Sequence, residues 1–284
     1  DAYGLGAREL SLDGQVRSSD GMTSFSAEGM LGGKGISLGK GLDGSLAGLE
    51  QSGQGTLVAP VVKQLRSALA REAPGSTFAA SYQLRRTGQL TTVNLPGALW
   101  RGSSGAHLLS LSRVSAGLGA KGGPRLAGYL ATSGNGLPQI EGRFERRGAS
   151  GGIAQLSLAD YRAGTTSLAL PQLVLVQLPS GAIGFSGRAL ASGDLPGGRV
   201  DGLALPIEGN WSADGGLAAL RRCTQVSFTR FKIANLALAG QSLNLCPGRD
   251  GAILKSDSKG TRLSAGTAGL ALSGTLGTTA IRLN

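Results

Sequence analysis

Residues 168–181 read LALPQLVLVQLPSG, and this stretch shows the pattern from which the fold is predicted. Leu168–Leu170 and Leu173–Val176 are short runs with the two-residue alternation that is typical of strands. Pro171 follows the first run, and Pro179–Gly181 has the composition of a tight turn. The stretch therefore predicts strands that are separated by turns.

The same pattern recurs along the whole chain. Turn signals are about eight to twelve residues apart, as in antiparallel hairpins that follow one another. The repetition has no fixed period, so a strict β-solenoid repeat is not evident. We expect an all-β fold made of antiparallel strands. The clearest other runs are Leu10–Leu12, Ile36–Leu38, Leu109–Leu111, Leu156–Leu158, Leu203–Leu205, Leu236–Leu238, Leu243–Leu245 and Leu270–Leu272.

The composition predicts many turns and a thin core. Glycine provides 49 of 284 residues, more than twice its average share of about 7%. Aromatic residues make up 4% of the chain and hydrophobic residues 40%, so Leu, Val and Ala must form the core. A mean hydropathy of +0.05 does not fit a disordered chain.

The net charge of +11 raises the question of nucleic-acid binding. The arginines are scattered, however, and their densest groups are pairs such as Arg85–Arg86, Arg146–Arg147 and Arg221–Arg222. No basic run stands beside an aromatic platform, so we expect no nucleic-acid partner. A basic surface near anionic lipid headgroups is at least as reasonable.

Residues 57–73, LVAPVVKQLRSALAREA, break the strand pattern and predict one short amphipathic helix. Pro60 suits a first helical turn, and Pro74–Gly75 ends the pattern. The helix could cap the sheet, or it could dock on a membrane surface or a partner. The domain organisation expected is a strand segment 1–56, the helix at 57–74 and a strand segment 75–284. The apolar stripe of the helix consists of Val58, Val61, Val62, Leu65 and Leu69.

The sequence offers no convincing catalytic group, so we expect a protein that is not an enzyme and that needs no cofactor or metal. The single histidine, His107, stands at a strand entrance, and Ser104 lacks the frame of a nucleophile elbow. Asp13, Asp43, Asp201 and Asp214 each precede a glycine, and Asp-Gly is a turn signal.

Two cysteines, Cys223 and Cys246, predict a structural disulfide. A two-residue turn at Ala234–Asn235 would place them directly opposite each other in a hairpin. A turn at Gly240–Gln241 would instead give a three-stranded meander bracketed by the cysteines. Either pairing indicates an oxidising compartment.

The chain opens at Asp1–Tyr3 and stops at Ile281–Asn284 within a strand-like pattern, and no apolar run approaches the ~18 residues of a membrane-spanning helix. We expect a piece of a longer chain whose export signal lies elsewhere.

Several stretches resemble the YdbH family of AsmA-like, TamB-like proteins, which are bridge-like intermembrane phospholipid transporters. The most specific is the segment that runs from Cys223 through Leu236–Gly240 to Cys246–Pro247. Less specific matches lie between residues 99 and 222, and residues 1–98 match only in their general pattern of short alternating runs and glycine turns. The less specific matches are Leu126–Gly128 with Ser133–Pro138, Leu156–Tyr161 with Leu168–Pro171 and Gly187, and Gly197–Gly198 with Leu203–Ile207 and Gly209.

The resemblance implies an elongated, curled antiparallel sheet whose hydrophobic groove conducts phospholipids from the inner to the outer membrane. It also implies a periplasmic location, an inner-membrane anchor in the missing part of the chain and an outer-membrane partner protein. Leucines from the clearest alternations would line the groove, and ordinary core packing is the alternative for each. The groove candidates are Leu109, Leu111, Leu156, Leu158, Leu168, Leu170, Leu203, Leu205, Leu236, Leu238, Leu243, Leu245, Leu270 and Leu272.

Two other functions fit the same pattern. A structural or adhesive β-solenoid module of a surface protein would have a closed, dry leucine core. An assembly factor of the same superfamily would bind outer-membrane β-proteins by pairing with an exposed strand edge.

Overall fold

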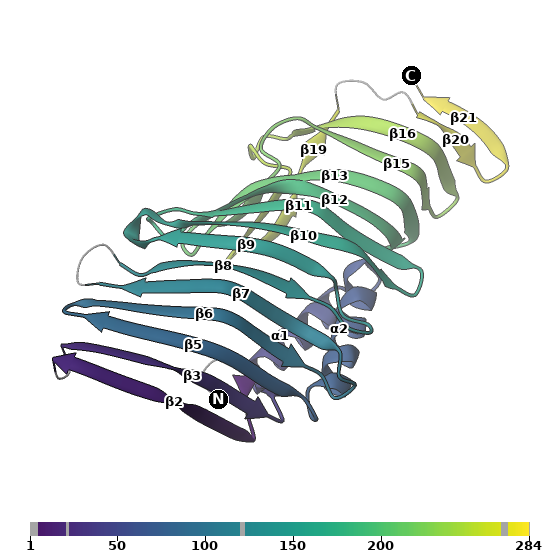
Figure 1. The fold of residues 1–284 in the computed structure, drawn as a ribbon. Coiled ribbons are helices and arrows are strands. Elements are labelled where there is room, and N and C mark those ends of the chain that lie inside the picture. The colour runs from purple at the N-terminus through teal and green to yellow at the C-terminus, as the bar shows by residue number, and fades with distance from the viewer. Residues whose placement is uncertain (1–4, 21–22, 120–122, 268–271, 284) are drawn as a thin grey trace. The chain divides into compact units, whose positions relative to one another are not determined.

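The computed structural model describes residues 5–20, 23–119, 123–267 and 272–283 and confirms the all-β prediction (Figure 1). Strands make up 65% of it and helices 11%, and the strand pairs are antiparallel. The chain forms two compact units. Unit 1 comprises residues 1–49 and 62–156, and unit 2 comprises residues 50–61 and 157–284. These units do not coincide with the segments expected at 1–56, 57–74 and 75–284, because each unit combines segments that are distant in sequence.

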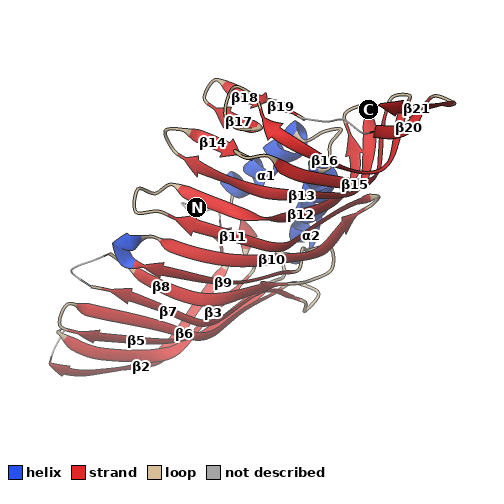
Figure 2. Cartoon of the chain, turned by 90° about the horizontal axis from the view of Figure 1, so that it is seen from above, coloured by secondary structure: helices blue, strands red, loops and turns tan. Residues whose placement is uncertain are grey.

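Unit 1 is a meander in which each long strand pairs with the next one in the order β2–β3–β5–β6–β7–β8–β9. A separate two-residue pair, β1–β4, precedes the helices. A 3-10 turn, η1 (Gly148–Ser150), follows β9 and is the short blue segment beside β8 and β10 in Figure 2. The strands are β1 (Leu5–Gly6), β2 (Glu9–Asp20), β3 (Ser24–Lys34), β4 (Ser37–Leu38), β5 (Thr77–Thr87), β6 (Leu90–Arg101), β7 (His107–Leu118), β8 (Arg125–Thr132) and β9 (Ile140–Arg147).

Two helices interrupt the strands, α1 (Lys40–Ser52) and α2 (Val58–Glu72). Helix α2 confirms the helix predicted at 57–73. Helix α1 was not predicted and corrects the expectation of strands throughout residues 1–56. Its glycines at positions 41, 44 and 48 argued against a helix in the sequence, because glycine is a poor helix former. The Arg66 guanidinium joins the helices through two bonds, of 3.2 and 3.1 Å, to the Asp43 carboxylate.

Helix α2 packs against the sheet through a small cluster. Ala68 is fully buried between Leu108 and Leu137, and Leu65 and Leu69 pack around them. The predicted stripe is thus confirmed at Leu65 and Leu69, whereas Val58 at the start of the helix is 46% exposed. The cluster fixes α2 at one end of the unit 1 strands.

Unit 2 continues the antiparallel pattern and then forks. Strand β12 lies between β11 and β13, and β13 pairs with β14 at one end and with β15 at the other. The order continues as β15–β16–β20–β21 on one branch and β14–β17–β18 on the other, with β19 beside β16. The strands, with β10 crossing the unit boundary, are β10 (Gly152–Ala163), β11 (Thr166–Gln177), β12 (Ile183–Leu195), β13 (Gly198–Ser212), β14 (Gly216–Ala219), β15 (Thr224–Ile233), β16 (Leu236–Pro247), β17 (Leu254–Asp257), β18 (Gly260–Leu263), β19 (Ala265–Gly266), β20 (Leu272–Leu276) and β21 (Thr279–Leu283).

The Cys223–Cys246 disulfide closes a two-stranded hairpin. Ile233 pairs with Leu236 across the turn, and Thr224 pairs with Leu245 beside the cysteines. The turn is therefore Ala234–Asn235, and the alternative meander with a turn at Gly240 is wrong.

The Asp-Gly pairs do not all mark turns, which corrects the sequence-based interpretation. Asp214–Gly215 lies between β13 and β14, as a turn signal should. Asp13–Gly14 lies within β2, and Asp43–Gly44 lies in α1. Asp201–Gly202 lies inside β13, where Gly202 has a φ of +61° that suits glycine.

Candidate functional site

The sheet of unit 1 has one continuous apolar face. Residues directly opposite in an antiparallel sheet share a face, so the register can be followed across all seven long strands. We define the apolar face by two such lateral rows. The first consists of Leu12, Leu31, Ala80, Ala98, Leu111, Leu130 and Gly142, and the second of Val16, Ala27, Leu84, Val93, Ala116, Leu126 and Arg146.

The opposite face, which we call the polar face, has a different composition. The row next to the second apolar row contains almost only polar side chains. It consists of Gln15, Glu28, Gln83, Asn94, Ser115, Ala127 and Glu145. Because neighbouring residues in a strand point to opposite faces, the two-residue alternation of the sequence becomes a sheet with one apolar and one polar side.

The two-residue alternation breaks on β7, but the apolar face stays continuous there. On β7 the apolar positions change from Leu109 and Leu111 to Val114 and Ala116. Arg113 between them has a φ of +51° and takes no part in the ladder with β6 or β8. A Cβ atom placed on Gly128 would lie 2.8 Å from both the Val114 and Phe144 side chains, so these residues do share a face.

Much of the apolar face in unit 1 is half-exposed. Ala80 and Ala98 are buried, but Leu84, Val93 and Leu95 remain partly open to solvent. The α2 cluster reaches this face at Trp100. On the edge strand β2, Leu12 is 71% exposed. The described part of unit 1 therefore contains apolar surface that the chain itself does not cover.

Apolar side chains in unit 2 are covered more fully. Val200, Phe228, Leu238 and Leu272 form one buried cluster. Ala219, Leu220 and Ile253 form a second one. Partly buried leucines pack against both clusters, so unit 2 has more of a conventional core than unit 1.

Thirteen of the fourteen groove candidates lie among the described residues, and none of these is fully exposed. Leu109 and Leu111 are half-exposed on the apolar face, and Leu156 contacts the position of Gly142 on the same face. Leu158 is buried, and Leu168 and Leu170 are half-exposed. Leu270 lies outside the described residues. The candidates that join or pack against the unit 2 clusters are Leu203, Leu205, Leu236, Leu238, Leu243, Leu245 and Leu272.

The sequence-based candidates omit the residues of the apolar face on β3, β5, β6 and β8. Leu31, Leu84, Val93 and Leu130 belong to it. Leu84 and Val93 stand among Arg and Thr residues rather than in a Leu-Ser-Leu run. Their place becomes evident only from the pairing of β5 with β6.

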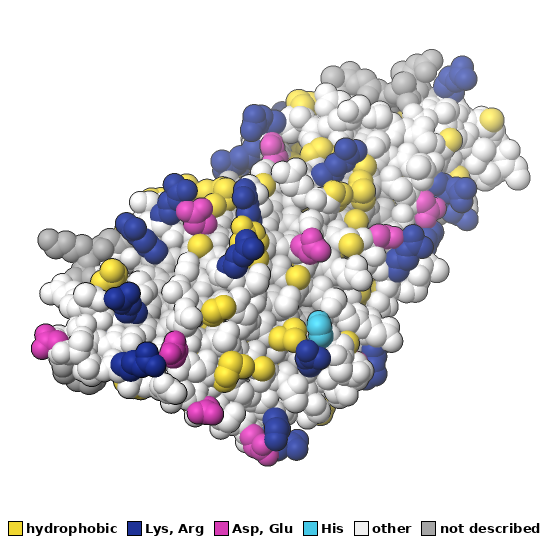
Figure 3. All heavy atoms as spheres, viewed as in Figure 1, with side chains coloured by type: hydrophobic (Ala, Val, Ile, Leu, Met, Phe, Trp, Pro, Cys, Tyr) yellow, Lys and Arg dark blue, Asp and Glu magenta, His cyan; other side chains and the backbone are white. Residues whose placement is uncertain are grey.

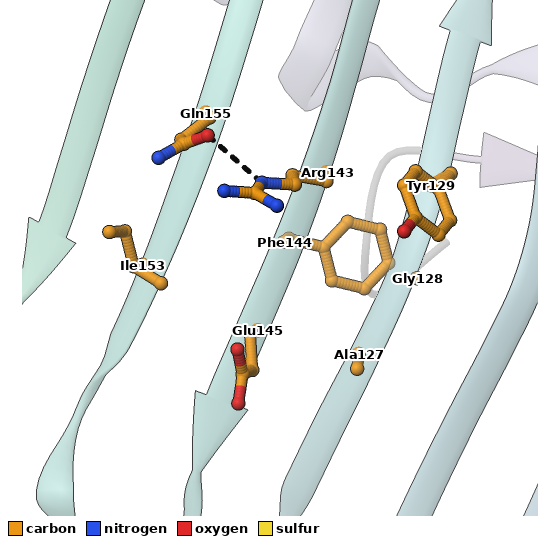
Figure 4. Close-up of a pocket in the computed structure, with 8 residues that line it drawn as sticks. All are labelled: Ala127, Gly128, Tyr129, Arg143, Phe144, Glu145, Ile153 and Gln155. Carbon is orange, nitrogen blue, oxygen red and sulfur yellow. Dashed lines mark hydrogen bonds between the residues drawn. The ribbon is translucent and has the colours of Figure 1, made fainter.

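Three open depressions adjoin one another on the polar face. Their cavity volumes are ≈ 450, ≈ 550 and ≈ 200 Å³. The first two share Thr92 and Asn94, and the last two share Ala127 and Glu145. Figure 4 shows the smallest, where the Arg143 Nε donates a hydrogen bond of 2.9 Å to the Gln155 side-chain oxygen.

Two carboxylates at the surface have perturbed pKa values. The hydrogen bond from the Arg147 guanidinium, 2.6 Å long, lowers the pKa of Glu145. The backbone N–H of Lys259 lowers the pKa of Asp257. In the described ranges, His, Cys, Asp and Glu side chains form no group of three that could hold a metal ion.

Searches with this chain found no matching family model, no matching curated protein and no matching solved structure. Neither helix is long and apolar enough to cross a membrane, as far as the described residues go. The disulfide indicates an oxidising compartment outside the cytoplasm.

Proposed function

We propose that the chain is a periplasmic segment of an AsmA-like protein of the YdbH type that conducts phospholipids between the inner and outer membranes. The full-length protein would be tethered to the inner membrane, and an outer-membrane protein would be its partner at the far end. The segment would act as a passive surface for acyl chains, without catalysis, cofactor or nucleic acid.

The observation that carries the proposal is the apolar face of unit 1. Burial of apolar surface releases about 25 cal/mol per Å², so acyl chains would gain free energy by covering half-exposed side chains such as Leu84 and Leu95. Rows of aliphatic residues without convergent polar groups would bind lipids weakly and uniformly. Such binding suits movement along the face.

The dimensions also support the proposal. One leaflet accounts for about 15 Å of a hydrocarbon core that is about 30 Å thick. At about 3.3 Å per residue, the apolar part of β6 from Val93 to Trp100 spans about 23 Å. An acyl chain could therefore lie along a strand with its headgroup at the strand end.

A second candidate function is supported by the edge strand β2. All twelve of its residues are exposed, and among the described residues it pairs only with β3. A free edge of this length could add a strand from an outer-membrane β-protein. This assembly function predicts binding of an extended peptide with no need for the apolar face.

The test is mass spectrometry of the phospholipid that co-purifies with the detergent-free chain, on a matched pair of variants. Leu111 and Leu130 are directly opposite each other on the apolar face, and Ser110 and Ala131 are their neighbours on the polar face. We expect L111D/L130D to lose most of the bound phospholipid and S110D/A131D to retain it.

A milder variant, L111N/L130N, provides the same comparison if the aspartates prevent folding, which circular dichroism would reveal. Equal phospholipid on both folded variants, or no phospholipid on the unmodified chain, would overturn the proposal and favour the assembly function.

A further inference from the structure

Six arginines gather at one end of the unit 1 strands, where β2 turns into β3, β5 into β6, and β9 into η1. We call this end the arginine rim. Figure 3 shows Lys and Arg side chains along the left-hand side of the molecule, where these strand ends lie in Figure 1. The rim consists of Arg17, Arg85, Arg86, Arg125, Arg146 and Arg147.

Two of these arginines end the apolar face. On β5, Leu84 is followed on the same face by Arg86, which is directly opposite Phe25 and Thr91. On β9, Arg146 is directly opposite Leu126. Leu126 is 37% exposed, so apolar surface continues to the point where the positive charge begins.

The other four arginines lie in a single lateral row on the polar face. Following the register across the sheet, this row contains no acidic residue. It consists of Arg17, Ser26, Arg85, Thr92, Gly117, Arg125 and Arg147. The row crosses the strands and therefore runs along the sheet rather than along any one strand.

The positive charge of the rim is only partly neutralised within the chain. Arg125 and Arg147 are directly opposite each other, and like charges in such a pair are destabilising. Glu145 forms an ion pair with Arg147. Among the described residues, Arg17, Arg85 and Arg125 have no carboxylate within ion-pair distance. At the other end of β2 and β3, in contrast, Lys34 pairs with Glu9 at 3.4 Å.

Three arginines of the rim also line a common depression, which opens on the polar face. Arg125, Arg146 and Arg147 line the depression of ≈ 550 Å³, together with the hydroxyl-bearing residues Thr92 and Ser115. A guanidinium presents several N–H donors in a planar fork that matches the oxygens of a phosphate group.

We infer that the arginine rim holds the phosphate of phospholipids whose acyl chains lie on the apolar face and whose headgroups extend past the strand ends, where arginines from both faces meet. This inference rests on the proposed function, and it assigns the headgroup a place that the apolar rows alone do not. The row crosses the strands in the direction in which lipids would pass from one strand to the next, so the rim would keep phosphates in register as the acyl chains move. The rim then selects phospholipids over neutral lipids with the same acyl chains.

The experiment offers the full chain vesicles that contain equal amounts of phosphatidylglycerol and diacylglycerol, and measures the ratio of the two lipids on the recovered protein. The rim variant is R86Q/R125Q. The matched control is R188Q/R230Q, which removes the same charge from exposed strand positions in unit 2. We expect the ratio to fall about fivefold in the rim variant, as the loss of two exposed charge contacts would give, with total lipid and the control unchanged.

The outcomes separate the two proposals. If wild type carries lipid and the ratio is unchanged in the rim variant, or falls equally in the control, the inference about the rim is wrong and the proposed function stands. If wild type takes up neither lipid, the proposed function fails and the rim inference fails with it. Repeating the uptake in 0.5 M salt, where charge contacts are screened over about 4 Å, should reproduce the lower ratio in wild type.

Discussion

At the scale of single residues, Glu72 shows how one side chain fixes the relation of helix to sheet. It is the last residue of α2 and is 5% exposed. Its carboxylate accepts hydrogen bonds from the backbone N–H of Ser104, at 3.1 Å, and from the Ser104 hydroxyl, at 2.8 Å. The end of the helix is thereby held against the turn between β6 and β7.

These hydrogen bonds make the contact sensitive to acid. The backbone N–H of Ser104, followed by its hydroxyl, lowers the pKa of Glu72 below its ordinary value of 4.5. A lowered folded-state pKa contributes stability that is present above the unfolded pKa and is lost as pH falls through the folded value. We expect E72Q to have a lower Tm than wild type at pH 7, and the difference to shrink below pH 4.5 in thermal melts followed by circular dichroism.

The exposed carboxylate Glu141 on β9 provides the control, because E141Q removes a charge without breaking a contact of this kind. A Tm difference between wild type and E72Q that stays constant from pH 7 to pH 3.5 would show that Glu72 acts by packing alone.

At the scale of elements, the alternating leucines predicted strands well, whereas the sequence predicted only one of the two helices. Leu109–Leu111 and Leu236–Leu238 lie in strands as expected. Helix α1 could not be predicted, because its three glycines disfavour an isolated helix and tertiary contacts such as Asp43–Arg66 must offset them. At α1 the local sequence disfavours a helix, and tertiary packing stabilises one nevertheless.

The hairpin of β15 and β16 should depend strongly on its disulfide. The cross-link closes a segment with a sequence separation of 23, and by the chain-entropy estimate such a loop contributes about 3 kcal/mol. We expect C223A/C246A to lose about that much free energy of unfolding in urea titrations.

The cross-strand pair Ser227 and Ser242 lies in the same hairpin and provides the matched control. S227A/S242A should change the free energy of unfolding by less than about 0.5 kcal/mol. If the two double variants proved equally stable, the hairpin would be held by its ladder and the cluster around Phe228 rather than by the cross-link.

At the scale of the whole molecule, the sequence predicted a sheet with one apolar side but not which residues form that side. A slip of one residue inverts the faces. The irregularities at Arg113 and at Leu170–Pro171 each shift the alternation within a strand. The sequence therefore predicted the strand within each leucine run, but it did not predict which face of the sheet successive runs share. The division into two units was not predictable either, because Glu50–Val61 belongs with residues far along the chain.

Lipid contact with the apolar face can be measured by placing a photoreactive amino acid on either side of one strand. Leu84 lies on the apolar face of β5 and its neighbour Gln83 lies on the polar face. Each is replaced in turn by p-benzoylphenylalanine, the protein is irradiated in cells, and the mass of the purified chain is measured. We expect adducts of phospholipid mass at Leu84 and none at Gln83. Equal adducts at both positions, or none at Leu84 in a folded protein, would contradict the claim that lipids travel on the apolar face.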